Sequence, residues 1–148
     1  MKIPLLTSLN HSEMTYLNSV VLLKTPRKIL NTFFILDTGS PKTILSYLDA
    51  MRLQIPFDSL SKTEIVSIGG RKYQGYIFNK LKFVFKSENE GTVEEDFPVC
   101  VIKPTSDKES NELSNMPTII GVDFLKSKKY ILFCDMDGGI AYLEKKKQ

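Results

Sequence analysis

The chain has 148 residues, a formal net charge of +3 and 42% hydrophobic residues, which suffices for one domain, residues 1–148, with a sizeable core. No stripe of Lys and Arg interleaves with aromatic residues, so the sequence does not favour a nucleic-acid partner. No apolar run reaches the roughly 18–20 residues of a membrane-spanning helix, and the N-terminus lacks a signal-peptide core. With only two cysteines, we expect a cytoplasmic protein without a membrane partner.

In chain order, the hydrophobic pattern predicts a mostly β protein with one or two short helices. Helices are predicted over 43–52, after Pro41, and over 123–128. The polar stretch 86–92 predicts a hairpin loop, and 103–115 predicts a longer loop that is either disordered or functional. Strands are predicted over residues 15–23, 29–36, 63–68, 73–86, 93–102, 118–121, 129–134 and 139–144.

Residues 33–40 read Phe-Phe-Ile-Leu-Asp-Thr-Gly-Ser, so an apolar run stops at a carboxylate. Four consecutive apolar residues predict a strand that is buried on both faces. Asp37 then lies at the mouth of the interior, where a carboxylate must be paired, hydrogen-bonded or functional. Because Asp and Gly also form ordinary turns, the tripeptide Asp-Thr-Gly needs support from other motifs.

Two further motifs follow in the chain. Gly69 and Gly70 separate the apolar stretch 65–68 from a second strand that includes 76–78, and a Gly-Gly pair between apolar segments predicts a tight hairpin. About eighty residues after the first motif, Ile119, Ile120 and Gly121 precede Val-Asp-Phe-Leu. Asp-Thr-Gly-Ser, a glycine-tipped hairpin and Ile-Ile-Gly-x-Asp-Phe-Leu therefore occur in a fixed order.

That order resembles the single-domain, retropepsin-like aspartic proteases over roughly residues 15–144. The resemblance implies a single-lobe closed β-barrel that is active as a two-fold homodimer. It implies that Asp37 is catalytic and that Thr38, Gly39 and Ser40 support it, with Thr38 reaching across the two-fold axis to the partner's backbone. Retroviral members often carry Arg directly after the glycine of Ile-Ile-Gly, whereas this chain has Val122 there. This difference leaves the mode of dimerisation open.

The resemblance also assigns roles around the cleft. Ile68, Gly69 and Gly70 match the tip of a flap that closes over bound peptide, and Ile119, Ile120 and Gly121 match the strand behind the Asp37 loop. The Ser40 hydroxyl is expected to donate to Asp37, which would lower the apparent pKa of the catalytic pair and favour an acidic optimum. In a dimer, the loop 103–115 is expected to lie near the cleft and narrow substrate access.

Peptide hydrolysis by this route needs two carboxylates about 3 Å apart that share one proton. The chain has one Asp-Thr-Gly, so the second carboxylate must come from a second copy related by a two-fold axis. The sequence thus predicts an aspartic endopeptidase that acts on peptides or unfolded proteins without a cofactor or metal. A non-catalytic peptide-binding or dimerisation module is the alternative, and a domain cut from a longer polyprotein is a third reading, which the initial Met1 disfavours.

The remaining residues that could take part in catalysis or metal binding give little evidence for a function. Asp123 precedes apolar residues at a predicted helix start, which favours a structural role. The run Asp-Met-Asp-Gly at 135–138 resembles the first motif of the haloacid-dehalogenase phosphatases, but only nine residues follow Gly139, too few for the rest of that active site. A calcium-binding loop that starts at Asp135 is excluded because its twelfth residue would be Lys146 and not Glu. We therefore expect a turn there. The lone histidine, His11, predicts a surface position, and Cys100 and Cys134 predict small buried hydrophobic residues.

Overall fold

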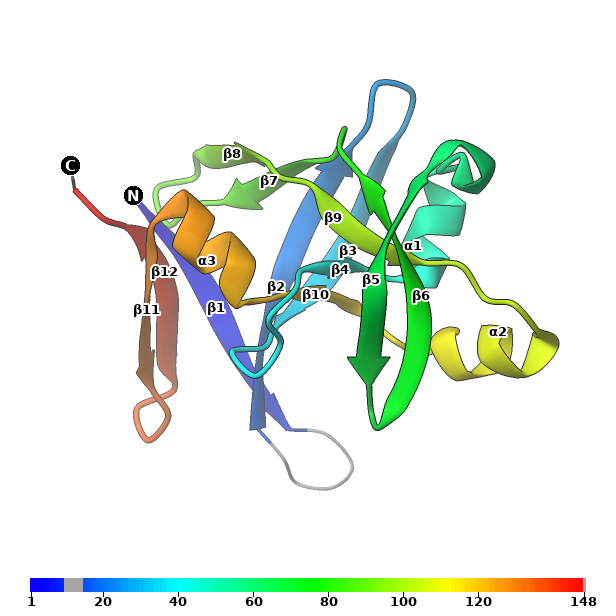
Figure 1. The fold of residues 1–148 in the computed structure, drawn as a ribbon. Coiled ribbons are helices and arrows are strands. Elements are labelled where there is room, and N and C mark those ends of the chain that lie inside the picture. The colour runs from blue at the N-terminus through cyan, green and yellow to red at the C-terminus, as the bar shows by residue number, and fades with distance from the viewer. Residues whose placement is uncertain (10–14, 148) are drawn as a thin grey trace.

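The computed structural model describes residues 1–9 and 15–147, and Figure 1 shows its fold. His11 lies outside the described residues. In the described part of the chain, three short α-helices accompany the strands: α1 (Tyr47–Arg52), α2 (Asp107–Leu113) and α3 (Val122–Lys128), with a 3-10 turn at Phe57–Ser59. No helix in the described part of the chain is long and apolar enough to cross a membrane. The strands are β1 (Lys2–Leu9), β2 (Thr15–Lys24), β3 (Ile29–Leu36), β4 (Ile44–Leu45), β5 (Ser61–Ile68), β6 (Arg71–Phe78), β7 (Lys82–Lys86), β8 (Thr92–Asp96), β9 (Val99–Ile102), β10 (Thr118–Ile120), β11 (Tyr130–Asp135) and β12 (Ile140–Lys145).

The strands form one sheet in the order β11-β12-β1-β2-β3-β10-β4-β9-β6-β5, with β7 paired to β2 and β8 to β7. Among the described strands, β11 and β5 end this path and do not pair with each other. The prediction of a mostly β fold is confirmed, but the prediction of a closed barrel is wrong. The physical reason is that both ends of the path are hairpins, β11–β12 and β5–β6, which project on opposite sides of the molecule instead of meeting (Figure 1).

The first strand has no counterpart among the predicted elements. The N-terminal half of β1 pairs with β12, from Lys2↔Glu144 to Leu5↔Ala141. The C-terminal half pairs with β2. Ile3 and Leu5 are buried, but Pro4 and the polar residues that follow obscure this alternation in the sequence. The first and last strands therefore pair within one chain.

Two predicted strands are each divided in the structure. The stretch 73–86 is divided at residues 79–81 into β6 and β7, and 93–102 is divided at Phe97 and Pro98 into β8 and β9. Proline has no N–H to give to a ladder, so a central strand cannot continue through it. The backbone N–H of Phe97 donates to the carbonyl of Leu81 (3.2 Å), which holds the two breaks together.

The helices also differ from the prediction at particular points. Helix α1 begins at Tyr47, later than predicted, because Ile44 pairs with Cys100 of β9 and with Ile119 of β10. Helix α2 lies within the predicted loop 103–115, so the chain has more helices than the one or two expected. The seven residues of α2 include one buried apolar residue, Leu113, which is too few to produce an amphipathic period.

An aromatic cluster occupies the centre of the core. The ring of Phe124, in α3, lies 5.2–5.9 Å from the rings of Phe83, Phe85, Phe97 and Tyr130. Aromatic pairs at these distances stabilise a protein by about 0.5–1.5 kcal/mol each beyond the area that they bury. The cluster therefore anchors α3, and with it the Gly121 turn that precedes the helix.

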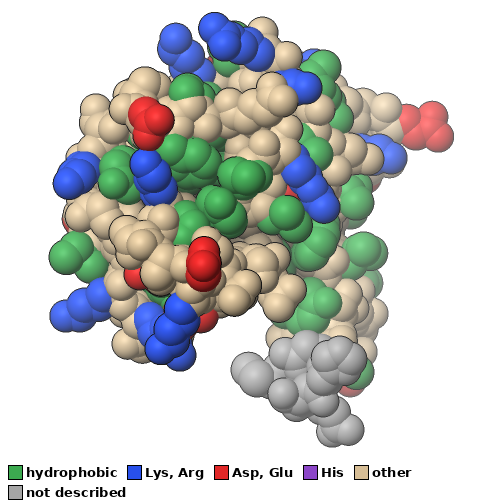
Figure 2. Space-filling view, turned by 90° about the vertical axis from the view of Figure 1, so that its right-hand side faces the viewer, with side chains coloured by type: hydrophobic (Ala, Val, Ile, Leu, Met, Phe, Trp, Pro, Cys, Tyr) green, Lys and Arg blue, Asp and Glu red, His purple; other side chains and the backbone are tan. Residues whose placement is uncertain are grey.

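Strand β3 is buried mainly on one face. Phe34 and Leu36 are buried, whereas the side chain of Phe33 is 51% exposed, so the prediction of burial on both faces is wrong. On the side of the molecule that bears α1 and α2, hydrophobic side chains gather near the middle with charged residues around them (Figure 2). Leu48 and Met51 of α1 are exposed as well.

The two cysteines differ in exposure, and the turn between the last two strands forms as predicted. Cys100 is buried as predicted, whereas Cys134 is exposed, because the last three residues of β11 lie at the exposed end of the β11–β12 hairpin. Residues 136–139 form the predicted turn between β11 and β12, in which Asp135 Oδ1 accepts from the N–H of Gly138 (2.9 Å).

Candidate active site

Asp37 follows the last residue of β3 and begins a tight loop. Its backbone N–H donates to the carbonyl of Ile120 (3.0 Å), and its carbonyl accepts from the N–H of Ser40 (3.1 Å). The N–H of Gly39 donates to Asp37 Oδ1 (2.9 Å), which orients the carboxylate from within its own turn. Asp37, Thr38 and Gly39 are exposed in the single chain, so the carboxylate is open to a ligand or to a second chain.

The Ser40 hydroxyl is directed away from this carboxylate. Ser40 Oγ donates to the carbonyl of Lys42 (2.7 Å). A hydroxyl has one proton, so it cannot at the same time donate a hydrogen bond to Asp37. The prediction that Ser40 donates to Asp37 is therefore wrong, and the acidic optimum expected from that bond loses this support. A local bond to a carbonyl two residues onward competes well for such a side chain.

Strand β10 lies parallel to β3 behind the loop, with Thr118↔Phe34, Ile119↔Ile35 and Ile120↔Leu36. At the end of β10, a Cβ on Gly121 would lie 2.5 Å from the carbonyl oxygen of Lys42 and 2.6 Å from that of Ser40. Only glycine allows the two backbones to approach this closely. Just beyond it, the N–H of Val122 donates to the Ser40 carbonyl (2.9 Å).

Thr43 and Asp123 hold this junction together. Asp123 Oδ1 accepts from Thr43 Oγ1 (2.7 Å) and from the N–H of Phe124 (2.7 Å), while Oδ2 accepts from the N–H of Thr43 (3.0 Å). Thr43 Oγ1 in turn accepts from the N–H of Gly121 (3.0 Å). Both carboxylate oxygens of Asp123 are thus engaged in structural contacts, as the sequence indicated, whereas the sequence reasoning missed Thr43.

The β5–β6 hairpin ends in the predicted glycine turn. Gly69 and Gly70 have φ of +57° and +79° and separate the paired residues Ile68 and Arg71. Two positive φ values in a two-residue loop define a type I′ turn, which glycine adopts without steric cost.

The hairpin and the Asp37 loop border one cleft of about 620 Å³. Of the residues that the sequence singled out, Asp37, Gly39, Ser40, Ile68, Gly69 and Ile119 line this cleft, whereas Thr38, Gly70, Ile120 and Gly121 do not. No residue of 103–115 lines it, so the single chain gives no support to the predicted narrowing of access by that stretch. The other lining residues are Pro41, Lys42, Ile44, Glu64, Ile65, Val66 and Ser67.

An ion pair joins the two walls of the cleft. Lys42 Nζ of the Asp37 loop lies 2.8 Å from Glu64 Oε1 of β5. The hydrogen bond to Glu64 raises the pKa of Lys42 against the smaller, opposite effect of burial. Both side chains are about half exposed, so the pair contributes little to global stability. The sequence reasoning missed it because two isolated charges, one on a loop and one on a strand, carry no pairing signal.

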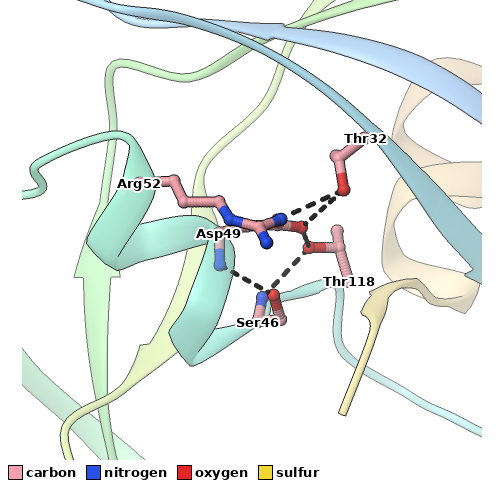
Figure 3. Close-up of polar contacts among 5 residues, drawn as sticks. All are labelled: Thr32, Ser46, Asp49, Arg52 and Thr118. Atoms are coloured by element: carbon pink, nitrogen blue, oxygen red, sulfur yellow. Dashed lines mark hydrogen bonds and ion pairs between the residues drawn. The ribbon is translucent and has the colours of Figure 1, made fainter. Parts of the chain in front are cut away.

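Asp49 of α1 is a buried carboxylate with several polar partners (Figure 3). Its side chain accepts from Thr118 Oγ1 (2.7 Å) and Thr32 Oγ1 (3.2 Å), and Arg52 lies 3.8 Å away. Ser46 caps the same helix by accepting from the Asp49 N–H (3.1 Å). Asp49 therefore fastens α1 to β3 and β10, the two strands that carry Asp37 and Gly121. No local motif identified it in the sequence.

No protein-family model matches the chain, and no curated protein matches it in sequence. The fold is similar to a solved retropepsin-like aspartic protease from Rickettsia conorii, with a TM-score of 0.57 and 15% identity over 98% of this chain and 91% of that one. The retroviral protease-like domain of Ddi1 from Leishmania major gives a TM-score of 0.48 and 14% identity over 87% of this chain and 96% of that one. The chain thus has a retropepsin-like fold.

Proposed function

We propose that the chain is an aspartic endopeptidase in which two copies of Asp37, one from each subunit of a homodimer, activate a water molecule. The observation that carries the proposal is the position of Asp37 in a retropepsin-like fold. Its oriented but exposed carboxylate lies at a cleft that a glycine-tipped hairpin borders. We also propose that residues 1–148 form one domain and that the protein is located in the cytoplasm.

The second carboxylate has to come from another chain. Within one chain, the oxygens of Asp123 and Asp49 already accept structural hydrogen bonds, and neither residue lines the cleft. Glu64 does line the cleft, but its carboxylate is paired with Lys42. The exposure of Asp37, Thr38 and Gly39 leaves this loop open for a two-fold contact, in which Thr38 would bond to the partner's backbone. Such a contact is isologous, so each subunit contributes the same residues.

The chemistry follows from the shared proton of the pair. One carboxylate, ionised, takes a proton from water as the water attacks the scissile carbonyl carbon. The other carboxylate, protonated, donates to the carbonyl oxygen and stabilises the charge that develops there. Proton transfer to the leaving nitrogen then breaks the C–N bond. Because two carboxylates this close titrate together, the apparent pKa values belong to the pair and not to either residue.

The cleft favours an extended peptide with apolar side chains. Strand β5 ends the sheet order, so among the described strands its outer edge is unpaired and can accept a peptide as an added strand. Apolar residues from both walls line the cleft, among them Ile44, Ile65 and Ile119. Unfolded proteins or flexible peptides supply such a segment, which matches the substrate class expected from the sequence.

The test is cleavage of a denatured protein and a peptide library between pH 3 and 8, with the oligomeric state measured by sedimentation. Asp37→Asn should reduce cleavage by at least about 1,000-fold, as removal of a central catalytic group does elsewhere. Asp137→Asn, which alters an exposed carboxylate in the β11–β12 turn, is the matched control and should retain activity. A folded dimer that cleaves nothing at any pH would favour the non-catalytic module instead.

A further inference from the structure

Helix α2 contacts the back of the β5–β6 hairpin through one carboxylate. Glu112 Oε1 forms an ion pair with the guanidinium of Arg71, and Glu112 Oε2 accepts from the hydroxyl of Tyr73 (2.9 Å). Arg71 is the first residue of β6 after the glycine turn, and Tyr73 lies two residues further on the same strand. Figure 1 shows α2 beside β6. One side chain therefore holds two points on the returning strand of the hairpin.

Apolar packing supports this contact. Leu113, the residue after Glu112, is only 2% exposed, and it shares a small second core with Tyr73 and with Val66 of β5. Ile44, which lines the cleft, belongs to the same cluster. Because Leu113 fixes the end of α2 against the hairpin, Glu112 acts from an anchored position.

The start of α2 is held as well. Ser106 caps the helix by accepting from the N–H of Glu109 (3.2 Å). The carboxylate of Glu109 accepts from the N–H (3.2 Å) and the hydroxyl (2.9 Å) of Thr105, the residue before Ser106. Bonds of this kind stabilise the first turn of a helix. The first turn of α2 is thus held by bonds to the residues that flank it, and the last turn by Leu113 and Glu112.

The hairpin itself is held in its middle and free at its tip. A Cβ added to Gly69 or Gly70 would meet no atom of the described residues within 4 Å, whereas Glu64 on β5 pairs with Lys42 and β6 is held by Glu112. The tip therefore depends on these contacts for its position relative to Asp37.

We propose that Glu112 is a positioning residue for the hairpin, which keeps Ile68 and Gly69 at the cleft through Arg71 and Tyr73. Glu112 does not line the cleft, so its effect on a peptide is indirect. A hairpin that is already ordered loses less conformational freedom when peptide binds, which strengthens binding. The kinetic part of this inference rests on the proposed peptidase function, while the structural part does not.

Hydrogen exchange on the ligand-free protein tests the structural part. Glu112→Gln removes the ion pair, and Tyr73→Phe removes only the hydroxyl. Each should accelerate amide exchange across residues 64–73 by about three- to tenfold, because local opening becomes easier, and should leave β7 and β8 unchanged. The control is Glu94→Gln, which breaks the exposed Lys82–Glu94 pair between β7 and β8 and should not affect the hairpin. Unchanged exchange in both hairpin variants would overturn the inference, whether or not the protein cleaves peptides.

Kinetics test the functional part. Glu112→Gln should raise KM by about three- to tenfold and change kcat by less than about twofold, because the chemistry at Asp37 is untouched. The charge-swapped pair Arg71→Glu with Glu112→Arg should recover part of both the exchange protection and the KM. Faster exchange with an unchanged KM would overturn the positioning role. If the variants exchange faster and the wild-type protein has no peptidase activity, the proposed function is contradicted and the structural contact stands.

Discussion

At the scale of single residues, the site depends on side chains that accept or donate more than one bond. Thr43 is buried, and its hydroxyl donates to Asp123 and accepts from the Gly121 N–H. It therefore joins the Asp37 loop, the end of β10 and the start of α3. Removal of this hydroxyl leaves the buried N–H of Gly121 without its acceptor, which costs more than the net value of one hydrogen bond.

We expect Thr43→Val to lower the free energy of unfolding by about 1–3 kcal/mol, because a buried N–H loses its acceptor. The measurement is urea denaturation followed by circular dichroism. Thr43→Ser keeps the hydroxyl and should recover most of the lost stability. A Val variant as stable as wild type would show that the hydrogen bonds at this junction contribute nothing to stability.

At the scale of elements, two glycines serve the site for different reasons. Gly121 has ordinary backbone angles, but a Cβ there would collide with two backbone oxygens of the Asp37 loop. Gly70 has open space around it and a φ of +79°. One position needs glycine because of crowding between elements, and the other because of the conformation of its own turn.

Gly121→Ala should therefore displace the Asp37 loop, with a loss of stability of about 1–3 kcal/mol from overpacking. We expect it to lower kcat. Gly70→Ala should cost about 1 kcal/mol, because a Cβ disfavours the left-handed conformation, and should act mainly on KM through the hairpin. Urea unfolding and steady-state kinetics of both variants separate the two effects. Equal kcat values for Gly121→Ala and wild type would contradict the role assigned to this close contact.

At the scale of the whole molecule, Glu95 connects the middle of the chain to its C-terminal hairpin. Its side chain is only 6% exposed. Tyr130 of β11 (2.9 Å) and Lys145 of β12 (2.7 Å) donate to Oε1, and Lys128 of α3 lies 3.6 Å from Oε2. Burial by itself raises the pKa of Glu95, but the hydrogen bonds from Lys145 and Tyr130 and the two lysine charges outweigh it, so the pKa is lowered. Burial, together with Glu95, raises the pKa of Tyr130, which keeps this residue a neutral donor.

A lowered pKa makes the folded state dependent on pH. The ionised Glu95 stabilises the fold above its ordinary pKa of 4.5, and this stabilisation is lost as the pH falls through the lower value of the folded state. Glu95→Gln should therefore reduce the melting temperature at pH 7 and flatten its decline below about pH 4.5. Thermal unfolding of both proteins from pH 7 to pH 3 is the measurement. Parallel curves would show that Glu95 does not contribute to the acid sensitivity.

Local patterns in the sequence were enough for several features of the site. The apolar run before Asp37 predicted a strand that ends at the carboxylate, and the pair Gly69–Gly70 predicted the tight turn, because φ preferences belong to individual residues. The position of Asp123 at a helix start predicted its structural role for a similar reason. Strand β1 and helix α2 escaped prediction because short segments with one or two buried residues lack a clear period.

Only the tertiary structure decided which distant residues meet. Thr43 bonds to Asp123, Glu64 to Lys42, and Glu112 to Arg71 and Tyr73; the partners come from separate elements, and no local pattern pairs them. The open sheet and the bond from Ser40 to Lys42 likewise depend on how strands and turns are arranged in space. The sequence by itself determined the strand that leads to the candidate carboxylate, the glycine turn of the β5–β6 hairpin and the position of that carboxylate. Strand order and packing determined the partners of each polar group, because hydrogen bonds and ion pairs require proximity that sequence separation does not encode.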